Sequence, residues 1–512
     1  MTVIDETGIA KRWTYHDLAH AAARFAATFE RAGLCRGDRV AAILSRQIET
    51  WICAIAAWRA GLTYVPLFCG FGADALRYRL EVCGARVVVV DHQWRQTLHD
   101  VQATLTQDLH VVTVADEHGA GVEPGDYRFW DELDLGMGDR EVVATRPDDP
   151  ATLLFTSGTT GPPKACVIPH SGFVSIIPYA VHGLGLDRQD LLFTTSDPGW
   201  AYGLYTTGLV PMSLGIPLVS YSGPFDPAAW LDVIRTERPT YLTAAPTAIR
   251  SLVQSIQREG VPASLRAAAT AGEPLDADTV SGWQNLTQSP IRDGYGLTEI
   301  GMVLGNLAVP PGEITPGAMG SVVPGFEALL VERDGTPVGE LDEGLIAVKR
   351  PRFQLSIGYD NVPQTWDARW VGDLFITEDR ARRDREGRWW FVGRDDDMIV
   401  TSGYKVGPIE IETVLLEHPA VADAGVVAKP DPKRGSVVRA VVVKRPDAPP
   451  EAVLTAELQD AVRTKVGRHA YPRIVEYVDA LSRTEVGKLK RAALRGGALT
   501  QAEASSDRRP ES

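Results

Sequence analysis

The spacing of apolar and polar residues predicts alternating helices and strands near the start of the chain. Between residues 15 and 33, apolar side chains such as Leu18, Phe25 and Phe29 recur every three or four positions, and Gly33 follows at a natural helix end. This spacing indicates an amphipathic helix. The alternation continues with a strand at 39–44, helices at 49–59 and 73–83, and a strand at 86–91. This order predicts an α/β fold in which helices cover both faces of a largely parallel sheet.

The pattern changes twice further along the chain. Residues 321–395 are short strand-like runs separated by turns, which predicts a β-rich subdomain. A charged run at 393–397 then precedes a final part in which helix-like and strand-like segments alternate. We expect a large N-terminal domain of packed mixed sheets covered by helices plus the β-rich subdomain (1–395), a small mobile α+β domain (396–500) and a disordered polar tail (501–512).

The composition narrows the class of protein. The 512 residues are 44% apolar and 23% charged, as in ordinary globular proteins, and the net charge of −14 argues against a nucleic-acid or anionic-membrane partner. The five cysteines are odd in number and widely spaced, so neither a disulfide scaffold nor a zinc site is expected. No basic start precedes an apolar run, and Arg59 interrupts the apolar stretch at 51–68, so no membrane span is expected. We expect a cytoplasmic enzyme that is a monomer or a homodimer.

The segment TSGTTGPPK at 156–164 carries the clearest chemistry. Hydroxyls, glycines and a lysine in one loop can surround phosphate oxygens with O–H groups, backbone N–H groups and a cation. The spacing is not that of the Walker motif, because Ala165 stands where that motif requires Ser or Thr. A flexible hairpin tip is the structural alternative. The candidate phosphate-binding residues are Thr156, Ser157, Gly158, Thr159, Thr160, Gly161 and Lys164.

This segment resembles the phosphate-binding loop of the adenylate-forming (ANL) superfamily, which includes acyl-CoA synthetases, stand-alone adenylation domains and luciferases. Further segments resemble motifs of the same superfamily in the same order, so the resemblance covers nearly the whole chain. The motifs are most similar to those of acetyl- and medium-chain acyl-CoA synthetases. The segments are AGEPL at 271–275, DGYGLTE at 293–299, VGD at 371–373, GRDDD at 393–397, SGYKVGPIEIE at 402–412 and RTEVGKLKR at 483–491.

The resemblance implies that the chain activates a carboxylic acid with ATP and Mg²⁺, releases pyrophosphate and passes the acyl group to coenzyme A. Such a site needs cations, because two like unit charges about 4 Å apart repel by about 4 kcal/mol at an effective dielectric constant of about 20. The implied catalytic residues are Lys488, which would bridge the carboxylate and the α-phosphate, Thr298, which would contact that phosphate, and Glu299, which would hold Mg²⁺.

The resemblance also assigns the remaining motif residues. Asp396 would be the pivot about which the small domain turns between two orientations, one for each half-reaction. The nucleotide-binding residues outside the phosphate loop would be Gly272, Glu273, Pro274, Asp293, Gly294, Tyr295, Thr298, Asp373 and Arg394. The channel for the pantetheine arm of coenzyme A would be lined by Ser402, Gly403, Tyr404 and Lys405.

Each of these residues has an ordinary structural alternative when taken alone. The alternatives are a solvated lysine for Lys488, a helix start for Thr298 and Glu299, a core aromatic for Tyr295, a turn residue for Asp373 and a surface ion-pair partner for Arg394. Two positions also depart from the family pattern. Lys405 stands where many acyl-CoA synthetases carry Arg, and Val371 stands where Thr is usual.

The acid is predicted to be bulkier than acetate. Acetate-specific relatives carry Trp at the position of Gly296, and a tryptophan fills a large volume. A medium-chain, branched, cyclic or aromatic acid is therefore expected, although each wall residue could instead be ordinary core. The candidate wall residues are Trp200, Ala201, Tyr202, Ala271 and Gly296.

Two other functions remain open from the sequence. A stand-alone adenylating enzyme would load the phosphopantetheine thiol of a carrier protein instead of coenzyme A. A nucleotide-binding protein without catalysis would act as a sensor or scaffold, although the joint presence of Lys488, Glu299 and Asp373 argues against it.

Overall fold

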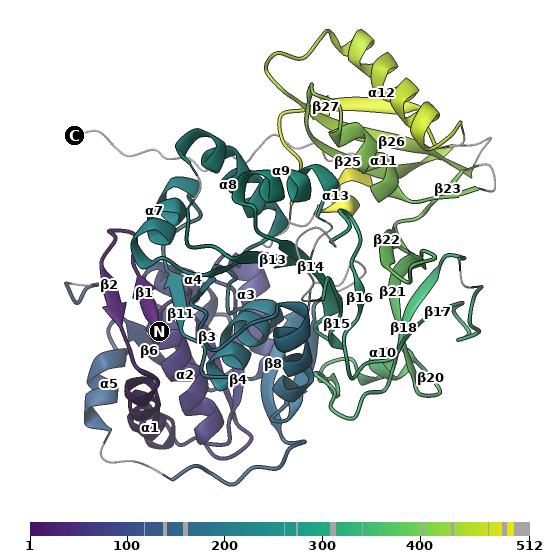
Figure 1. Cartoon of the computed structure of the whole chain (residues 1–512). Coiled ribbons are helices and arrows are strands. Elements are labelled where there is room, and N and C mark those ends of the chain that lie inside the picture. Colours follow the sequence, from purple (N-terminus) through teal and green to yellow (C-terminus); the bar gives the residue numbers. More distant parts are fainter. Residues whose placement is uncertain are drawn as a thin grey trace. The chain divides into compact units, whose positions relative to one another are not determined.

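The structure is a computed structural model of the chain (Figure 1). It describes residues 1–512 except 117, 137–140, 157–161, 261, 273–274, 308–313, 340, 402–403, 432–434, 469, 484–488 and 496–512, and it leaves out the side chains of 400, 404–405, 435 and 492. The chain divides into two compact units. The first contains Met1–Leu329, Ala347–Ile376 and Gly387–Trp389, and the second contains Leu330–Ile346, Thr377–Glu386 and Trp390–Ser512.

Helix α1 (Tyr15–Arg31) shows how the sequence pattern becomes structure. Thr14 and Asp17 form a capping box at its start, with the Asp17 backbone N–H donating to Thr14 Oγ1 at 3.0 Å. The apolar stripe, which includes Leu18, Phe25 and Phe29, is buried. The helix predicted over 15–33 is therefore confirmed.

One sheet of the first unit has eight strands among the described residues, with parallel pairing except at β8–β9 and β9–β19. Its side chains alternate between two cores. Val40 and Val87 pack with α1 and α2 (Ile48–Arg59), whereas Ala41 and Val88 pack with α3 (Ala73–Cys83) and α4 (Arg95–Gln102). The helix–sheet–helix arrangement expected from the sequence is confirmed. The strands, in spatial order, are β19 (Gly358–Tyr359), β9 (Lys164–Pro169), β8 (Pro150–Thr156), β4 (Thr63–Pro66), β3 (Arg39–Ile43), β5 (Val87–Asp91), β6 (His110–Val114) and β7 (Tyr127–Arg128).

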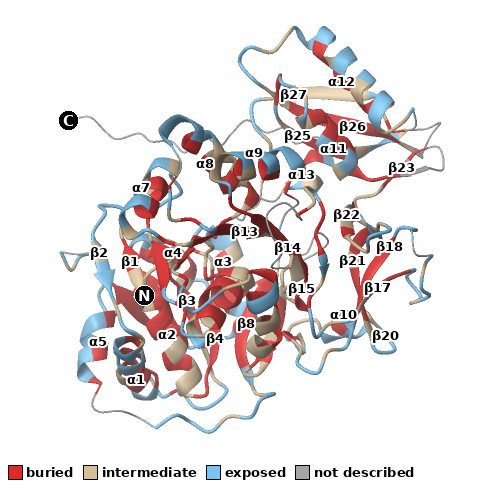
Figure 2. Cartoon of the chain, viewed as in Figure 1, coloured by how far each residue is buried: buried red, intermediate tan, exposed pale blue. Residues whose placement is uncertain are grey.

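The other large sheet has nine strands among the described residues. Its central pairs are parallel, and the pairs β1–β2, β14–β15 and β15–β16 are antiparallel. Helices α7 (Pro227–Glu237), α8 (Pro246–Glu259) and α9 (Ala277–Thr287) cover one face, where Trp230, Leu252 and Trp283 are buried (Figure 2). The strands, in spatial order, are β16 (Ser321–Val322), β15 (Gly301–Gly305), β14 (Ile291–Leu297), β13 (Ala267–Ala271), β12 (Tyr241–Thr243), β10 (Leu192–Thr194), β11 (Leu218–Tyr221), β1 (Thr2–Ile4) and β2 (Ala10–Arg12).

The region 321–395 is β-rich, as predicted. The turn at 333–335 closes with a hydrogen bond from the Gly335 N–H to the Glu332 carbonyl oxygen, at 3.0 Å. The sheet runs in the order β17 (Ala328–Val331), β18 (Gly344–Lys349), β21 (Leu374–Arg383) and β20 (Trp370–Val371), with β22 (Trp389–Arg394) also paired to β21.

The C-terminal part of the second unit is a small α+β assembly. Helices α11 (Pro408–Leu416) and α12 (Glu451–Lys465) bury Ile411, Leu415, Leu454 and Leu458 against the sheet. The alternation of helices and strands predicted for this final part is therefore confirmed. The sheet runs in the order β24 (Tyr404–Val406), β23 (Ile399–Thr401), β26 (Gly435–Lys444) and β25 (Val421–Asp431), with β27 (Ile474–Val478) paired to β26.

Short helices complete the described elements. Two segments of the first unit, Tyr179–Gly183 and Tyr202–Leu209, are π-helical, a conformation that is rare and frequent at functional sites. The remaining α-helices are α5 (Phe129–Leu135), α6 (Val210–Ser213), α10 (Pro363–Asp367) and α13 (Arg491–Arg495).

Candidate active site

The predicted phosphate loop joins two antiparallel strands. β8 ends at Thr156, β9 begins at Lys164, and these two residues face each other in the ladder. The loop is therefore followed directly by a strand and not by a helix. Ser157, Gly158, Thr159, Thr160 and Gly161 lie outside the described residues, so phosphate binding by the loop stays a prediction.

Thr298 and Glu299 lie in the turn between β14 and β15, not at a helix start. The Ile300 N–H donates to the Leu297 carbonyl oxygen at 3.2 Å and closes the turn. The Thr298 carbonyl oxygen accepts a hydrogen bond from Ser356 Oγ at 2.6 Å. The turn is therefore held from both sides.

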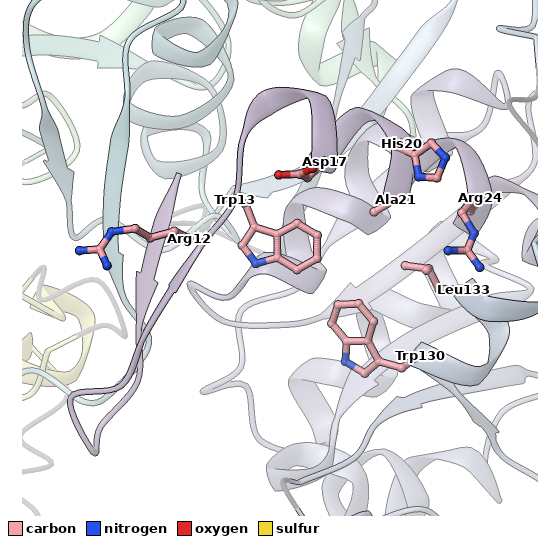
Figure 3. A pocket seen from close by; sticks show the side chains of 8 residues that line it. All are labelled: Arg12, Trp13, Asp17, His20, Ala21, Arg24, Trp130 and Leu133. Carbon is pink, nitrogen blue, oxygen red and sulfur yellow. The ribbon is translucent and has the colours of Figure 1, made fainter.

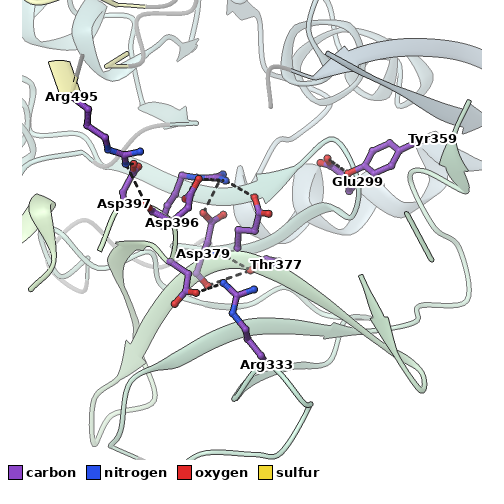
Figure 4. A network of polar contacts seen from close by, with 11 residues as sticks. Glu299, Arg333, Tyr359, Thr377, Asp379, Asp396, Asp397 and Arg495 are labelled. Atoms are coloured by element: carbon purple, nitrogen blue, oxygen red, sulfur yellow. Dashed lines mark hydrogen bonds and ion pairs between the residues drawn. The ribbon is translucent and has the colours of Figure 1, made fainter. Parts of the chain in front are cut away.

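Tyr359 contacts both this turn and Lys164 at the end of the predicted phosphate loop. Its hydroxyl donates to Glu299 Oε1 at 2.7 Å (Figure 4), and Lys164 Nζ lies 5.3 Å from the centre of its ring. Burial raises the pKa of the Tyr359 phenol well above its ordinary value, and the charge of Glu299 raises it further, so the phenol stays protonated as a donor. One side chain thus contacts both a predicted phosphate ligand and the predicted metal ligand.

Three residues with evident roles in this arrangement were missed from the sequence: Ser356, Tyr359 and Asn361. Asn361 accepts the Ala165 N–H at 3.0 Å and donates to the Pro163 carbonyl oxygen at 3.1 Å, so it braces the exit of the loop. The consecutive polar residues Tyr-Asp-Asn at 359–361 were a possible signal in the sequence. The sequence could not show which residues they contact, because Glu299 is 60 residues away from Tyr359 in the chain.

Asp293 connects the two segments predicted to bind adenine. It is 8% exposed, and its carboxylate accepts hydrogen bonds from the backbone N–H groups of Gly294, at 2.9 Å, and Leu275. Burial raises the pKa of Asp293 to about 7, because these hydrogen bonds compensate only part of the lost hydration. Gly272 has φ +94°, a conformation that favours glycine. Glu273 and Pro274 lie outside the described residues.

Strand β14 places alternate residues on opposite faces of its sheet. Tyr295 is half-buried on one of them. A Cβ at Gly294 would lie 2.0 Å from Tyr179 Oη, and a Cβ at Gly296 would lie 2.2 Å from the Gly301 carbonyl oxygen. Both positions therefore require glycine in this backbone. At Gly296 the cause is the close approach of β15, and the deeper acyl pocket expected from the missing tryptophan stays a prediction.

The candidate acyl-pocket residues 200–202 point into three different clusters. Trp200 packs against Phe68 and Phe71, with ring centres 5.9 and 6.1 Å away. Ala201 joins the core around α1 and α2, and Tyr202 packs in the buried cluster that contains Tyr179, Ala271 and Ala269 of β13. The structure brings Tyr202 and Ala271 together and separates Trp200 from them. Tyr179, which the sequence analysis did not single out, joins this group.

The two predicted ribose ligands lie in different units. Asp373 is exposed in the two-residue turn between β20 and β21, where its carbonyl oxygen accepts the Arg350 N–H at 2.8 Å. Arg394 is ion-paired, with its Nε 2.9 Å from Asp396 Oδ1 and its Nη2 2.5 Å from Glu378 Oε2. Both structural alternatives are therefore present, and ribose binding stays a prediction for both residues.

Lys488, Ser402 and Gly403 lie outside the described residues, and so do the side chains of Tyr404 and Lys405, whose backbones form β24. The roles predicted for these residues remain predictions.

The described residues could hold Mg²⁺ only together with the phosphates of a bound substrate. No group of three or more His, Cys, Asp or Glu side chains that could hold a metal occurs in the described part of the chain. Mg²⁺ is often held by one or two carboxylates together with substrate phosphates. Glu299 supplies one carboxylate, oriented by Tyr359, and it borders a cavity of about 10 Å³.

A separate hollow on the first unit lies beside β2, α1 and α5 (Figure 3). The rings of Trp13 and Trp130 stack there with centres 6.1 Å apart, next to Arg12, Asp17 and Arg24. None of the predicted site residues lines this hollow.

The described helices include none with the length and apolar character that a membrane span requires. The two large, mostly parallel sheets, the β-rich region and the small α+β part together have the architecture of the adenylate-forming superfamily.

Comparisons with known proteins agree with this class. The AMP-binding enzyme family matches residues 2–359, and the AMP-binding enzyme C-terminal domain matches residues 410–488. The mouse protein "Acyl-coenzyme A synthetase ACSM3, mitochondrial" is 33% identical over 503 residues, which cover 96% of this chain and 85% of the relative. The chain therefore belongs to the AMP-binding enzyme family.

Solved structures extend the likeness to the whole fold. A Brucella canis acyl-CoA synthetase is 31% identical with a TM-score of 0.75, and the match covers 97% of this chain and 90% of that one. The anthranilate CoA ligase AuaEII, solved with anthranoyl-AMP, is 25% identical with a TM-score of 0.88, and the match covers 97% and 93%. Together, family and relatives make this chain an AMP-forming acid–thiol ligase that uses ATP, a carboxylic acid and coenzyme A.

Proposed function

We propose that the chain activates an acid bulkier than acetate, using the residues assigned above. The observation that carries this assignment is the contact of Tyr359 with both Lys164 and Glu299. It supports a site in which the end of the phosphate loop and the metal-binding turn share one set of phosphates.

In the first half-reaction, a carboxylate oxygen of the acid forms a bond to the α-phosphorus of ATP. The bond between the α-phosphorus and its bridging oxygen breaks, and pyrophosphate leaves. Lys488 would hold the carboxylate against the α-phosphate, and Thr298 would donate to that phosphate. Mg²⁺, held by Glu299, would neutralise the phosphates.

In the second half-reaction, the thiol sulfur of coenzyme A attacks the acyl carbon, the thiol proton is lost to solvent and AMP leaves. We expect the small domain to turn about Asp396, to remove Lys488 and to present residues 402–405 to the pantetheine arm. We also propose that the domain boundary lies between residues 395 and 396, and that the enzyme is cytoplasmic.

The acid would lie beside Tyr179, Tyr202 and Ala271. The buried hydroxyls of Tyr179 and Tyr202 interact with each other, and in the described part of the chain neither has a further hydrogen-bond partner. Buried polar groups normally have such partners. A hydroxyl, amino or carbonyl substituent on a ring or chain would supply one, which supports including substituted acids among the candidates.

The experiment is a panel of acids tested with ATP, Mg²⁺ and coenzyme A. It compares acetate with butyrate, octanoate, 2-methylbutyrate, cyclohexanecarboxylate, benzoate, 2-aminobenzoate and hydroxybenzoates. Pyrophosphate release and acyl-CoA formation are both measured. We expect at least one bulkier acid to exceed acetate in kcat/KM by about tenfold or more, because each added methylene in a fitted pocket contributes about tenfold or more.

The outcomes separate the parts of the proposal. Acetate as the best substrate would contradict the predicted acid size. Pyrophosphate release without acyl-CoA, together with acylation of a phosphopantetheinyl carrier protein, would favour carrier loading. Absence of acid-dependent pyrophosphate release across the panel would contradict the adenylation chemistry itself.

A further inference from the structure

Three consecutive aspartates, Asp395, Asp396 and Asp397, join β22 to β23 within the second unit. They are the acidic part of the GRDDD motif, in which the resemblance assigned a role to Asp396 alone. The structure gives each of the three a different set of partners. Figure 4 labels Asp396 and Asp397 together with Arg333 and Arg495.

Asp395 is held by the β-rich sheet. Its carboxylate accepts a hydrogen bond from Arg380 Nη1 of β21 at 2.9 Å and is also bound by Arg333, from the turn after β17. Its backbone N–H donates to the Glu378 carbonyl oxygen at 2.7 Å. Its side chain is 14% exposed. Although burial alone would raise it, the two guanidinium groups hold the pKa of Asp395 below its usual range.

Asp397 is held by the C-terminal α+β part. Arg495 binds its carboxylate, and Arg491 Nε lies 3.5 Å from Asp397 Oδ2. Arg491 also contacts Glu412 of α11 at 2.7 Å. The Asp397 and Arg491 side chains are 11% and 13% exposed, so this ion pair is largely shielded from water, whereas Arg495 is 39% exposed.

Asp396 lies between these two anchors. Its carboxylate accepts a hydrogen bond from Arg394 Nε at 2.9 Å, and the side chains of Arg394 and Asp396 are 28% and 26% exposed. Breaking a shielded carboxylate–arginine pair leaves a charge without compensation, which is far more costly than exchanging a partly hydrated pair. Backbone rotation at Asp395 or Asp397 would break the shielded pairs with Arg380 or Arg491. Rotation at Asp396 would disturb only its partly hydrated pair with Arg394 and the exposed contact of Arg495 Nη2 with its carbonyl oxygen at 3.3 Å.

We propose that Arg333 with Arg380, and Arg491 with Arg495, are two arginine clamps that hold the residues on either side of Asp396 and so confine domain rotation to that one residue. The four arginines are positioning residues. The clamp on Asp397 lies three and seven residues after Lys488, so it also ties the pivot to the helix that follows the lysine. The inference rests on the two-orientation scheme proposed above.

The test compares charge-removing variants with a control on the same unit. Arg491→Gln and Arg495→Gln open the clamp on Asp397, and Arg333→Gln weakens the clamp on Asp395. Lys444→Gln is the control, because it breaks the 2.6 Å ion pair with Glu451 without touching the aspartates. Adenylation and thioester formation from supplied acyl-adenylate are measured separately.

We expect the double variant Arg491→Gln/Arg495→Gln to lose about tenfold in kcat for both half-reactions, with KM for ATP and acid within about twofold of wild type. The single variant Arg491→Lys should keep most of the wild-type kcat, because lysine keeps the positive charge beside Asp397. Arg333 is 72% exposed, so Arg333→Gln should cost only about twofold. Turnover of the double variant equal to that of Lys444→Gln would overturn the proposal.

Hydrogen exchange provides a readout that does not depend on activity. In wild type the Asp397 N–H donates to the Arg394 carbonyl oxygen at 3.1 Å. Opening the clamp should speed exchange at 397–399 about tenfold while β25 and β26 keep their protection. Unchanged exchange at 397–399 would overturn the proposal, even if the acid panel showed no activity. If the double variant unfolds, the same exchange measurement is made on Arg495→Gln alone. This variant should stay folded, because the Arg495 side chain is 39% exposed.

Discussion

Asp293 and Glu299 of the first unit have different kinds of partner from Asp395 and Asp397 of the second. In the first unit, Asp293 receives hydrogen bonds from backbone N–H groups, and Glu299 receives one from the Tyr359 phenol. The arginine pairs described for this unit involve other carboxylates, such as Asp190 with Arg266. In the second unit, Asp395 and Asp397 are each bound by two arginines.

The difference indicates what the carboxylates of each region do. Carboxylates without a fixed cation suit a place where cations arrive with the substrate or with a moving domain. Carboxylates saturated by arginines suit a place where geometry must be kept. Glu412 is an instructive intermediate, because burial raises its pKa to about 7 although Arg491 is its neighbour.

The largest expected effect tests the dependence of the first unit on a delivered cation. Lys488→Ala should lower the rate of adenylation by about 10²- to 10³-fold, because the negative reactants lose their bridging ammonium group. Thioester formation from supplied acyl-adenylate should persist. The control is Lys490→Ala, an exposed lysine two residues on. Equal losses in both half-reactions of a folded Lys488→Ala variant would contradict the division of labour.

A second prediction concerns the carboxylate of the first unit that we assign to the metal. Glu299→Gln should lower kcat/KM for ATP about 100-fold and raise the Mg²⁺ concentration that gives half-maximal rate. Tyr359→Phe should cost about tenfold, because it removes the group that orients Glu299. Glu327→Gln, at an exposed ion pair with Lys349, is the control. An unchanged Mg²⁺ requirement in Glu299→Gln would exclude Glu299 as the ligand.

A third prediction contrasts the pH dependence of stability. Asp293 and Glu412 have folded-state pKa values of about 7, above their ordinary 3.8 and 4.5. Their contribution is therefore fully present below about pH 4 and lost as pH rises through 7. The pKa of Asp395 is lowered, so its contribution is present above its ordinary value of 3.8 and lost as pH falls through its folded-state pKa.

Thermal unfolding between pH 4 and pH 8 measures this contrast. Wild type should lose on the order of a few kcal/mol of unfolding free energy across this range, and Asp293→Asn and Glu412→Gln should each flatten the decline. Asp395→Asn should leave the decline intact. If the unfolding free energy of Asp293→Asn declined with pH as steeply as that of wild type, this carboxylate would be ionised in the folded state at neutral pH.

The smallest expected effect concerns the exposed turn that carries Asp373. Val371→Thr restores the hydroxyl usual in relatives and should lower KM for ATP by less than about threefold, the range of one neutral hydrogen bond. Asp373→Ala should raise it by about tenfold or more, because hydrogen bonds to a charged group are stronger. A larger effect from Val371→Thr than from Asp373→Ala would contradict the predicted ribose contact.

Much of the fold could be predicted because the pattern is local. The buried stripe of α1 follows from the helical period of its apolar residues, and the buried strands β3 and β5 follow from their continuous apolar runs. The partners of Glu299, Asp293 and Trp200 could not be predicted, because they come from strands and loops distant in the chain. Gly296 shows the limit clearly, since its reason for being glycine is the backbone of β15.

The sequence by itself determined the class of reaction, because the order and chemistry of the motifs are written in consecutive residues. It also marked 393–397 as a junction through its run of charge. Only the tertiary structure decided that Tyr359 serves both Lys164 and Glu299, and that three identical aspartates have three different sets of partners. The physical reason is that the state of a carboxylate depends on which charges and dipoles surround it, and the folded chain assembles that environment from distant segments.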